Sequence, residues 1–300
     1  MEFIEVKQIV NPTSDAYWFG TDYTMNVYRG CCHGCIYCDS RSRCYNVNEF
    51  DKIKIKQNAL EIIQSDLRKK NKKGIIGTGS MSDPYNPLEQ ELRLTRGALE
   101  LVDEYGFGIF IATKGKLLMR DVDILKRIKK HSPVICAVTI TCADDGMSKK
   151  IEPNAPSSSE RFQILRKLWD EGIYCGVLLG PILPYITDSI QNILQVVQKA
   201  HEAGASFVYP TFGVTLRDNQ RNYFYDKLDQ KFPGIKENYI RDYGDTYYCS
   251  IKDFNSVYDS FKNECGKYGL LHNMQQITSA AKRNYEFDQL SFLDHIDLEE

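Results

Sequence analysis

The sequence has no long hydrophobic run. None of its stretches approaches the roughly 20 consecutive apolar residues that a membrane-spanning helix needs. The first residues, Met1–Lys7, do not combine a basic start with an apolar run, so they do not indicate a signal peptide. From these two absences we expect a cytoplasmic protein that does not enter the membrane.

The sequence also has little net charge. A formal charge of −2 provides no global field that would attract nucleic acid. Basic residues are nevertheless frequent between Arg41 and Lys73. A solvated helix face is the simplest interpretation of this segment. Contact with the phosphate backbone of a nucleic acid is the alternative.

Cysteine, by contrast, is abundant, with ten residues in the chain. The tight triplet Cys31-x3-Cys35-x2-Cys38, in a chain without a signal peptide, favours a metal site over disulfides. Three thiolates can bind three irons of a cubane [4Fe–4S] cluster, which usually has four cysteine ligands. The fourth iron would then be open to a ligand from outside the protein. Cys136 and Cys175 lie in apolar runs and are expected to be small buried side chains.

The same triplet has two alternative interpretations. In the first, Cys32 or His33 completes a zinc site, because zinc takes four nitrogen or sulfur ligands. Zinc motifs, however, usually combine two short clips, and the sequence has no second clip. In the second, the chain is an iron–sulfur protein that carries electrons without catalysing a reaction.

Apolar, β-branched runs alternate with helix-period segments over the first 210 residues. The sequence predicts strands at Tyr23–Tyr28, Gly74–Gly79, Gly108–Thr113, Val134–Thr141, Tyr174–Leu179 and Ser206–Pro210. It predicts helices at Asn58–Lys70, Thr95–Tyr105, Asp121–Lys130, Ser157–Glu171 and Asp188–Ala203. Six such units indicate an α/β fold, a partial (β/α)6 TIM-type barrel with its chemistry at the rim after the strands.

The composition changes after about residue 212. We therefore expect a barrel core over residues 1–212 and a C-terminal extension, residues 213–300, packed on that core. Within the extension, Gln220–Phe232 and Asp253–Tyr268 are predicted to be helices. The last residues, Asp294–Glu300, are expected to form a solvated tail.

Polar motifs follow the predicted strands. They are Tyr28-Arg29-Gly30-Cys31 with Gly34-Cys35-Ile36-Tyr37-Cys38, Ser82–Glu89, Thr113-Lys114, Arg120-Asp121, Glu152-Pro153 and Gly180-Pro181-Ile182. In this order the motifs resemble the spore-photoproduct-lyase-like branch of the radical SAM superfamily. The resemblance implies a lyase-like enzyme that uses a [4Fe–4S] cluster and S-adenosylmethionine (SAM). An electron from a flavodoxin- or ferredoxin-type donor would cleave SAM to a 5′-deoxyadenosyl radical, which abstracts hydrogen from a substrate.

The resemblance also assigns roles to individual residues. It implies that Cys31, Cys35 and Cys38 bind iron. It implies that Ser82, Lys114 and Thr139 hold the methionine end of SAM and that Tyr37 and Gly180 pack against its adenosine end. From the residue types alone, a carboxylate and a guanidinium could grip a zwitterion, and Glu152 and Arg161 are the candidates. A surface ion pair is the simpler interpretation of these two residues.

One position departs from the family pattern. Ser80 stands where the photoproduct lyases have a cysteine that returns a hydrogen atom to the product radical. A serine hydroxyl is a poor hydrogen-atom donor. We therefore expect another substrate or another donor, such as Cys142, Cys32 or a tyrosine. The substrate could be a nucleic acid, a peptide or a small molecule.

Overall fold

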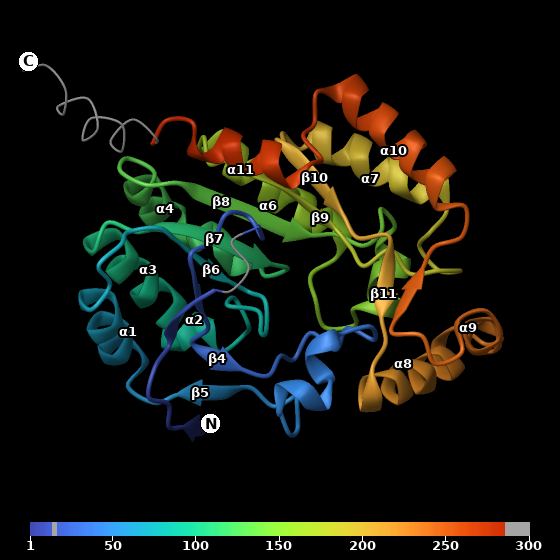
Figure 1. Cartoon of the computed structure of the whole chain (residues 1–300), viewed down its shortest axis with the longest axis horizontal. Helices are drawn as coiled ribbons and strands as arrows, with labels where there is room; N and C mark the ends of the chain where they lie inside the picture. Colours follow the sequence, from blue (N-terminus) through green and yellow to red (C-terminus); the bar gives the residue numbers. More distant parts are fainter. Residues whose placement is uncertain (14–16, 286–300) are drawn as a thin grey trace, which may run out of the picture.

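The computed structural model of the chain describes residues 1–13 and 17–285. Its main feature is a seven-stranded sheet in the order β10–β9–β8–β7–β6–β3–β2 (Figure 1). The strands are β2 (Val10–Pro12), β3 (Tyr23–Met25), β6 (Ile75–Thr78), β7 (Gly108–Thr113), β8 (Val134–Thr139), β9 (Cys175–Leu179) and β10 (Phe207–Pro210). The tail predicted at residues 294–300 lies outside the described residues.

Six of these strands run parallel to one another, from β3 across to β10. Only β2 is antiparallel, at the end of the sheet beside β3. In the part of the chain that the structure describes, the two end strands do not pair and the barrel stays open. The prediction of a partial barrel built from six β/α units is therefore confirmed.

Helices connect the parallel strands and cover the sheet. They are α1 (Ala59–Arg68), α2 (Glu89–Leu92), α3 (Leu94–Glu104), α4 (Val122–Ile128), α5 (Asp145–Ile151), α6 (Ser158–Asp170) and α7 (Ile190–Glu202), with the 3-10 helix η3 (Lys116–Asp121) before α4. The start of α6 carries a capping box. The Glu160 N–H donates to the Ser157 hydroxyl at 3.3 Å, and the Ser157 N–H donates to the Glu160 carboxylate at 2.8 Å.

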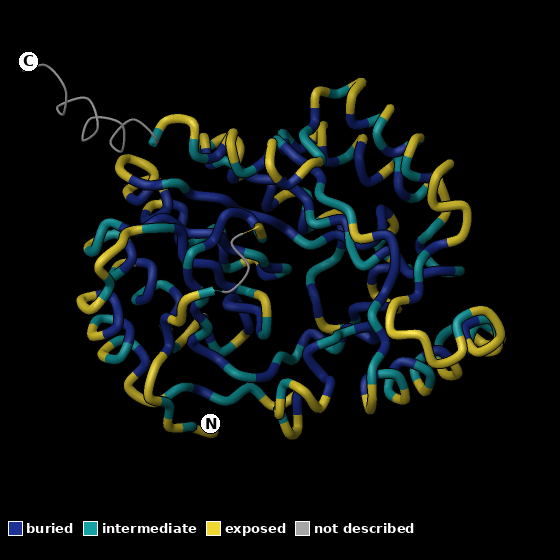
Figure 2. Tube along the Cα trace, in the orientation of Figure 1, coloured by how far each residue is buried: buried dark blue, intermediate teal, exposed yellow. Residues whose placement is uncertain are grey.

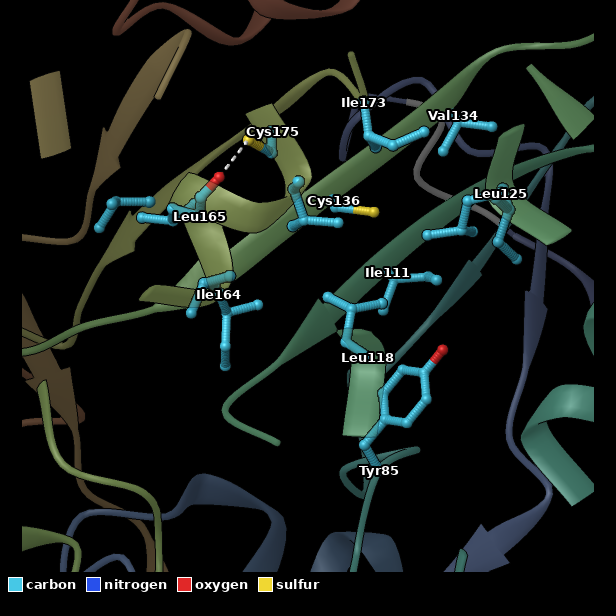
Figure 3. Packing of buried hydrophobic residues seen from close by; sticks show 14 of the residues in the cluster. Tyr85, Ile111, Leu118, Leu125, Val134, Cys136, Ile164, Leu165, Ile173 and Cys175 are labelled. Carbon is cyan, nitrogen blue, oxygen red and sulfur yellow. Dashed lines mark hydrogen bonds between the residues drawn. The ribbon is translucent and has the colours of Figure 1, made fainter. Parts of the chain in front are cut away.

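The core lies between the sheet and these helices. Figure 2 shows the buried strands in dark blue and the exposed outer faces of the helices in yellow. Cys136 and Cys175 are fully buried among aliphatic side chains (Figure 3). The Cys175 thiol donates a weak hydrogen bond to the Leu165 carbonyl at 3.7 Å. Their expected role as small buried side chains is confirmed.

A second, smaller sheet was not predicted from the sequence. It contains β1 (Glu2–Ile4), β5 (Lys54–Lys56) and β4 (Tyr28–Arg29), in the order β1–β5–β4. The single strand predicted at Tyr23–Tyr28 is split, because the chain leaves the large sheet after Met25 and pairs β4 antiparallel with β5. This break carries the chain into the cysteine loop, which continues into the 3-10 helices η1 (Asp39–Arg41) and η2 (Arg43–Tyr45).

Residues 213–285 add further strands and helices after β10. They comprise β11 (Gly213–Thr215), α8 (Asp218–Lys231), α9 (Ile235–Tyr243), β12 (Tyr248–Ser250), α10 (Phe254–Tyr268) and α11 (Met274–Lys282). The two helices predicted in this segment are confirmed as α8 and α10. Helix α10 packs against α7 (Figure 1). None of the helices in the described residues is long and apolar enough to span a bilayer.

Replacing Phe261 with alanine is expected to lower the free energy of unfolding by about 3–5 kcal/mol. Phe261 lies on α10, is fully buried and packs edge-on against Phe212 of the core segment. Urea unfolding followed by circular dichroism measures the loss. Phe254→Ala is the matched control, because Phe254 lies on the same helix but is 41% exposed. This variant should lower the free energy of unfolding clearly less than Phe261→Ala does. Equal losses in the two variants would contradict this packing.

Candidate cluster and SAM site

The cysteine loop is shaped by glycines and anchored to the segment before β5. Gly30 has a φ of +83° and Gly34 a φ of +69°, a region that favours glycine. A Cβ on Gly30 would lie 2.6 Å from the Lys52 carbonyl oxygen, so no larger residue fits there. The Cys31 N–H donates to the Phe50 carbonyl at 2.8 Å. The first cysteine is therefore held at a defined place.

The other side of the loop is bound to the segment that follows α5. The Ile36 N–H donates to the Ile151 carbonyl at 3.0 Å, and the Asn154 N–H donates to the His33 carbonyl at 3.1 Å. The Asn154 side chain also donates to the Cys32 carbonyl at 2.8 Å. Hydrogen bonds thus hold the loop on both sides.

The three predicted iron ligands line one cavity of about 130 Å³, together with Ser82, Lys114 and Thr139. All three cysteines are free thiols. Burial raises the pKa of Cys35 to about 12 and that of Cys38 to about 11. Since iron binds thiolates, metal binding has to release these protons.

The arrangement fits a cluster better than a zinc ion. In the described residues, no three or more His, Cys, Asp or Glu side chains are grouped around a single ion position. His33 lines the cavity with the three cysteines, and its Nδ1 lies 3.5 Å from Asp83 Oδ2, whereas Cys32 does not line the cavity. In a cubane each cysteine binds a different iron, so the sulfurs need not converge on one point.

Lys114 brings a positive charge into this cavity. Its Nζ lies 3.9 Å from Glu152 Oε1 and 5.8 Å from the centre of the Tyr37 ring. Burial by itself would lower the pKa of Lys114, but the neighbouring Cys35 and Glu152 raise it above its ordinary value. The ammonium therefore stays charged, and it can pair with the carboxylate of a ligand.

Glu152 and Arg161 lie behind the cavity wall. Both are fully buried and form an ion pair with each other. Arg161 also donates to the Thr139 carbonyl and the Ser148 hydroxyl, each at 2.8 Å, and Glu152 accepts from the Tyr37 hydroxyl. Neither residue lines the cavity. The sequence-based expectation of a direct grip on a zwitterion thus differs from the structure, because the guanidinium already has its partners inside the protein.

A larger cavity of about 370 Å³ adjoins the cluster cavity. Both cavities are lined by Tyr37, Ser80 and Thr139, and the larger one also by Gly180. A Cβ on Gly180 would lie 2.9 Å from the Thr211 side chain, so glycine permits this close approach. The residues predicted for the two ends of SAM therefore surround two neighbouring spaces.

The two cysteines suggested as hydrogen donors lie elsewhere. Cys142 is 1% exposed and its thiol donates to the Asp144 carbonyl, and neither Cys142 nor Cys32 lines either cavity. Tyr248 of β12 does line the larger cavity. Sequence reasoning missed this tyrosine, because it lies in a tyrosine-rich segment with no spacing that links it to the cysteines.

Asp83 is a second residue whose importance the sequence did not reveal. Its carboxylate accepts from the Thr113 hydroxyl at 2.5 Å, the Lys114 N–H at 2.8 Å and the Tyr85 N–H at 2.9 Å. It therefore joins the loop after β6 to the end of β7. Its position in the Ser82–Glu89 motif could have drawn attention to Asp83. The motif by itself did not indicate which residues Asp83 contacts.

Three of the separated motifs meet in one buried network. The fully buried Glu89 accepts from the Tyr28 hydroxyl at 2.5 Å, from Arg120 Nη2 at 2.7 Å and from the Thr95 N–H at 2.9 Å. The Tyr28 carbonyl in turn accepts from the Ser82 hydroxyl at 3.0 Å. These motif residues thus support the start of the cysteine loop and the wall of the cavity.

A family model described as the radical SAM superfamily matches residues 25–197. The chain belongs to the radical SAM superfamily. The match runs from β3 into α7 and contains the cysteine loop. Membership implies a [4Fe–4S] cluster, SAM and an electron donor, and the residues lining the cavity fit this pair of cofactors. The protein is therefore a radical SAM enzyme.

Relatives by sequence are an uncharacterized protein of Mycobacterium tuberculosis and one of Methanocaldococcus jannaschii. The first is 28% identical over 240 residues, 78% of this chain and 70% of the relative. The second is 34% identical over 188 residues, 62% of this chain and 68% of the relative. Radical SAM Nalpha-GlyT isomerase of Pseudomonas phage M6 is 25% identical over 189 residues, 59% of this chain and 38% of that enzyme.

Among solved structures, spore photoproduct lyase complexed with dinucleoside spore photoproduct is similar, with a TM-score of 0.66. The alignment covers 89% of this chain and 80% of the lyase chain at 13% identity. At this identity the likeness shows a shared fold. An alignment that covers 89% of this chain is longer than residues 1–212, so the shared fold includes part of the C-terminal extension.

Proposed function

We propose that Cys31, Cys35 and Cys38 hold a [4Fe–4S] cluster at which this enzyme cleaves SAM reductively and abstracts hydrogen from an organic substrate. The observation that carries the proposal is the shared cavity, in which three free thiols and the Lys114 ammonium face one space. This space adjoins a larger cavity of about 370 Å³, which would provide additional room for SAM and the substrate.

The bound cofactors would supply the radical chemistry, in which one electron splits SAM into methionine and a 5′-deoxyadenosyl radical. The protein chain would bind these cofactors and orient them. Lys114 would pair with the SAM carboxylate, Ser82 and Thr139 would hold the methionine end, and Tyr37 and Gly180 would hold the adenosine end. Glu152 and Arg161 act as positioning residues, since they hold the Tyr37 hydroxyl and the Thr139 carbonyl in place.

We propose a nucleic acid as the first substrate candidate, with a peptide or a small molecule as alternatives. The support is the fold shared with spore photoproduct lyase, whose structure contains a dinucleoside spore photoproduct. The test is to incubate the reduced, reconstituted enzyme with SAM and DNA, RNA or peptide, and to measure 5′-deoxyadenosine. Acceleration by peptide alone would reject the nucleic acid.

We also propose Tyr248 as the group that returns a hydrogen atom to the product. A phenol O–H gives up a hydrogen atom more easily than the serine hydroxyl at position 80, and Tyr248 lines the larger cavity. The flavodoxin- or ferredoxin-type donor would return the electron, and solvent the proton, that restore the phenol.

Replacing Lys114 with alanine is expected to leave the cluster intact and to weaken SAM binding by about 10- to 100-fold, the value of one hydrogen bond to a charged group. The SAM-dependent change in the EPR spectrum of the reduced cluster measures the affinity. Lys116→Ala is the control, because that exposed lysine pairs with Glu160 outside the cavity. Unchanged affinity in the Lys114 variant would remove Lys114 from the site.

The same titration tests the alternative of a non-catalytic electron carrier. A carrier would show the cluster signal but no response to SAM. Since Lys114 would have no ligand in a carrier, its replacement would leave every spectrum unchanged.

A further inference from the structure

A separate cavity of about 250 Å³ is lined by residues of the small sheet, of η2 and of the loop after β6. We call it the β4–β5 cavity, and Asn26, Arg29, Gly30, Tyr45, Lys56 and Met81 are among its lining residues. Met81 also lines the cluster cavity, and Gly30 directly precedes Cys31. The two spaces therefore share Met81 as a lining residue.

Two positive charges face the β4–β5 cavity, and no Asp or Glu is among the described residues that line it. One edge of the Arg29 guanidinium is occupied, since Nη2 donates to the Asn46 carbonyl at 2.8 Å. The Lys56 ammonium has no ion pair or hydrogen bond to any residue that the structure describes. Burial, and then the nearby Arg29, lower the pKa of Lys56 below its ordinary value. Two like charges thus converge where a counter-charge is missing.

Lys54 provides an internal comparison for Lys56. It is two residues earlier on β5, so its side chain leaves the same face of the strand, while Ile55 between them is buried. Lys54 Nζ forms an ion pair with Glu2 at 2.6 Å. The lysine next to the cavity is therefore left without the kind of partner that its neighbour on the strand has.

Asn26 adds a second, independent observation. Its Oδ1 atom is buried and has no hydrogen-bond partner. An unsatisfied buried polar atom costs about 1–3 kcal/mol, so such atoms usually have a partner. The amide can present either its oxygen or its NH₂ group to a ligand by rotating about its last torsion. Asn26 lines the β4–β5 cavity, and its NH₂ group, turned toward the cavity, would donate a hydrogen bond to a phosphate oxygen.

We propose that the β4–β5 cavity binds a phosphate group. A phosphate dianion matches the two positive charges of Arg29 and Lys56, and its oxygens accept hydrogen bonds from ammonium, guanidinium and amide donors. A carboxylate would neutralise only one of the two charges. None of the three cysteines assigned to the cluster lines the β4–β5 cavity, and neither does Lys114, so the site is distinct from the proposed SAM site.

The test is calorimetric titration of the full-length reconstituted protein with inorganic phosphate at constant ionic strength. Lys56→Met is expected to weaken binding by about tenfold or more, since it removes a charge-assisted contact and keeps most of the apolar stem. Lys54→Met should bind phosphate like the unchanged protein. Equal affinity in the Lys56 variant would overturn the proposal, and so would equal losses in the two variants.

Two further titrations separate the sources of the phosphate. A short 5′-phosphorylated oligothymidylate that binds, and binds more weakly to Lys56→Met, identifies the group as the terminal phosphate of a nucleic acid. Binding of inorganic phosphate without binding of the oligonucleotide identifies a small phosphate-bearing molecule. Acetate that binds as tightly as phosphate would overturn the proposal, and absence of binding by both phosphate probes would overturn it as well. Retained cluster absorbance in both lysine variants keeps this result distinct from a failure of the proposed SAM chemistry.

Discussion

Replacing Cys35 with serine is expected to abolish the iron–sulfur cluster and, with it, all cleavage of SAM. Cys35 is buried in the wall of the cluster cavity, and a cluster that keeps only two cysteine ligands in a site built for three is not retained. Iron and sulfide content, visible absorbance and the EPR spectrum of the reduced protein measure the cluster. Chromatography of 5′-deoxyadenosine measures SAM cleavage.

The adjacent Cys32 provides the control. It belongs to the same loop but does not line the cluster cavity, so Cys32→Ser should keep its iron, its sulfide and its response to SAM. The zinc alternative expects the opposite, because Cys32 would then be a candidate fourth ligand. SAM turnover that survives in the Cys35 variant would refute the assigned ligands.

Replacing Arg161 with methionine is expected to lower the free energy of unfolding by about 3–5 kcal/mol, the usual cost of leaving a buried charge without its partner. Glu152 would keep only the Tyr37 hydroxyl and Lys114, whose Nζ is 3.9 Å away. Urea unfolding of the metal-free protein measures the loss. Arg166→Met on the same helix is the matched control, because Arg166 makes an exposed contact with the Glu202 carbonyl.

The pH dependence of stability provides a second readout for this pair. Burial alone would raise the pKa of Glu152, but Arg161 and Lys114 lower it below its ordinary value of 4.5. The stabilisation from Glu152 is therefore present above pH 4.5 and is lost as the pH falls through the lowered pKa of the folded state. The Arg161 variant should lose less stability on acidification. An unchanged acid profile would show that the pair does not set it.

Much of the fold could be predicted from the sequence. The strands β6 to β10 and the helices α1, α3, α4, α6, α7, α8 and α10 lie within one or two residues of their expected positions, because hydrophobic period is a local property. The small sheet could not be predicted. Its strands are two or three residues long, too short to show a period, and β4 forms only because β5 lies beside it.

The candidate site divides in the same way. The spacing of Cys31, Cys35 and Cys38 could be read directly, because the three residues belong to one loop. Whether Arg161 faces a ligand or a buried carboxylate could not be read, because both roles use the same residue type. Only the packed structure shows that the Glu152 carboxylate, nine residues before Arg161, forms an ion pair with the Arg161 guanidinium.

The alternation of strands and helices, the cysteine triplet and the family motifs could all be recognised without the structure, since each of them depends on residues close together along the chain. Only the packed chain shows which charged groups are buried, that Lys56 faces a cavity while Lys54 pairs with Glu2, and that Tyr248 and Ser80 line one cavity. Burial and pairing depend on segments that are far apart in the sequence. They are set only when the whole chain has packed.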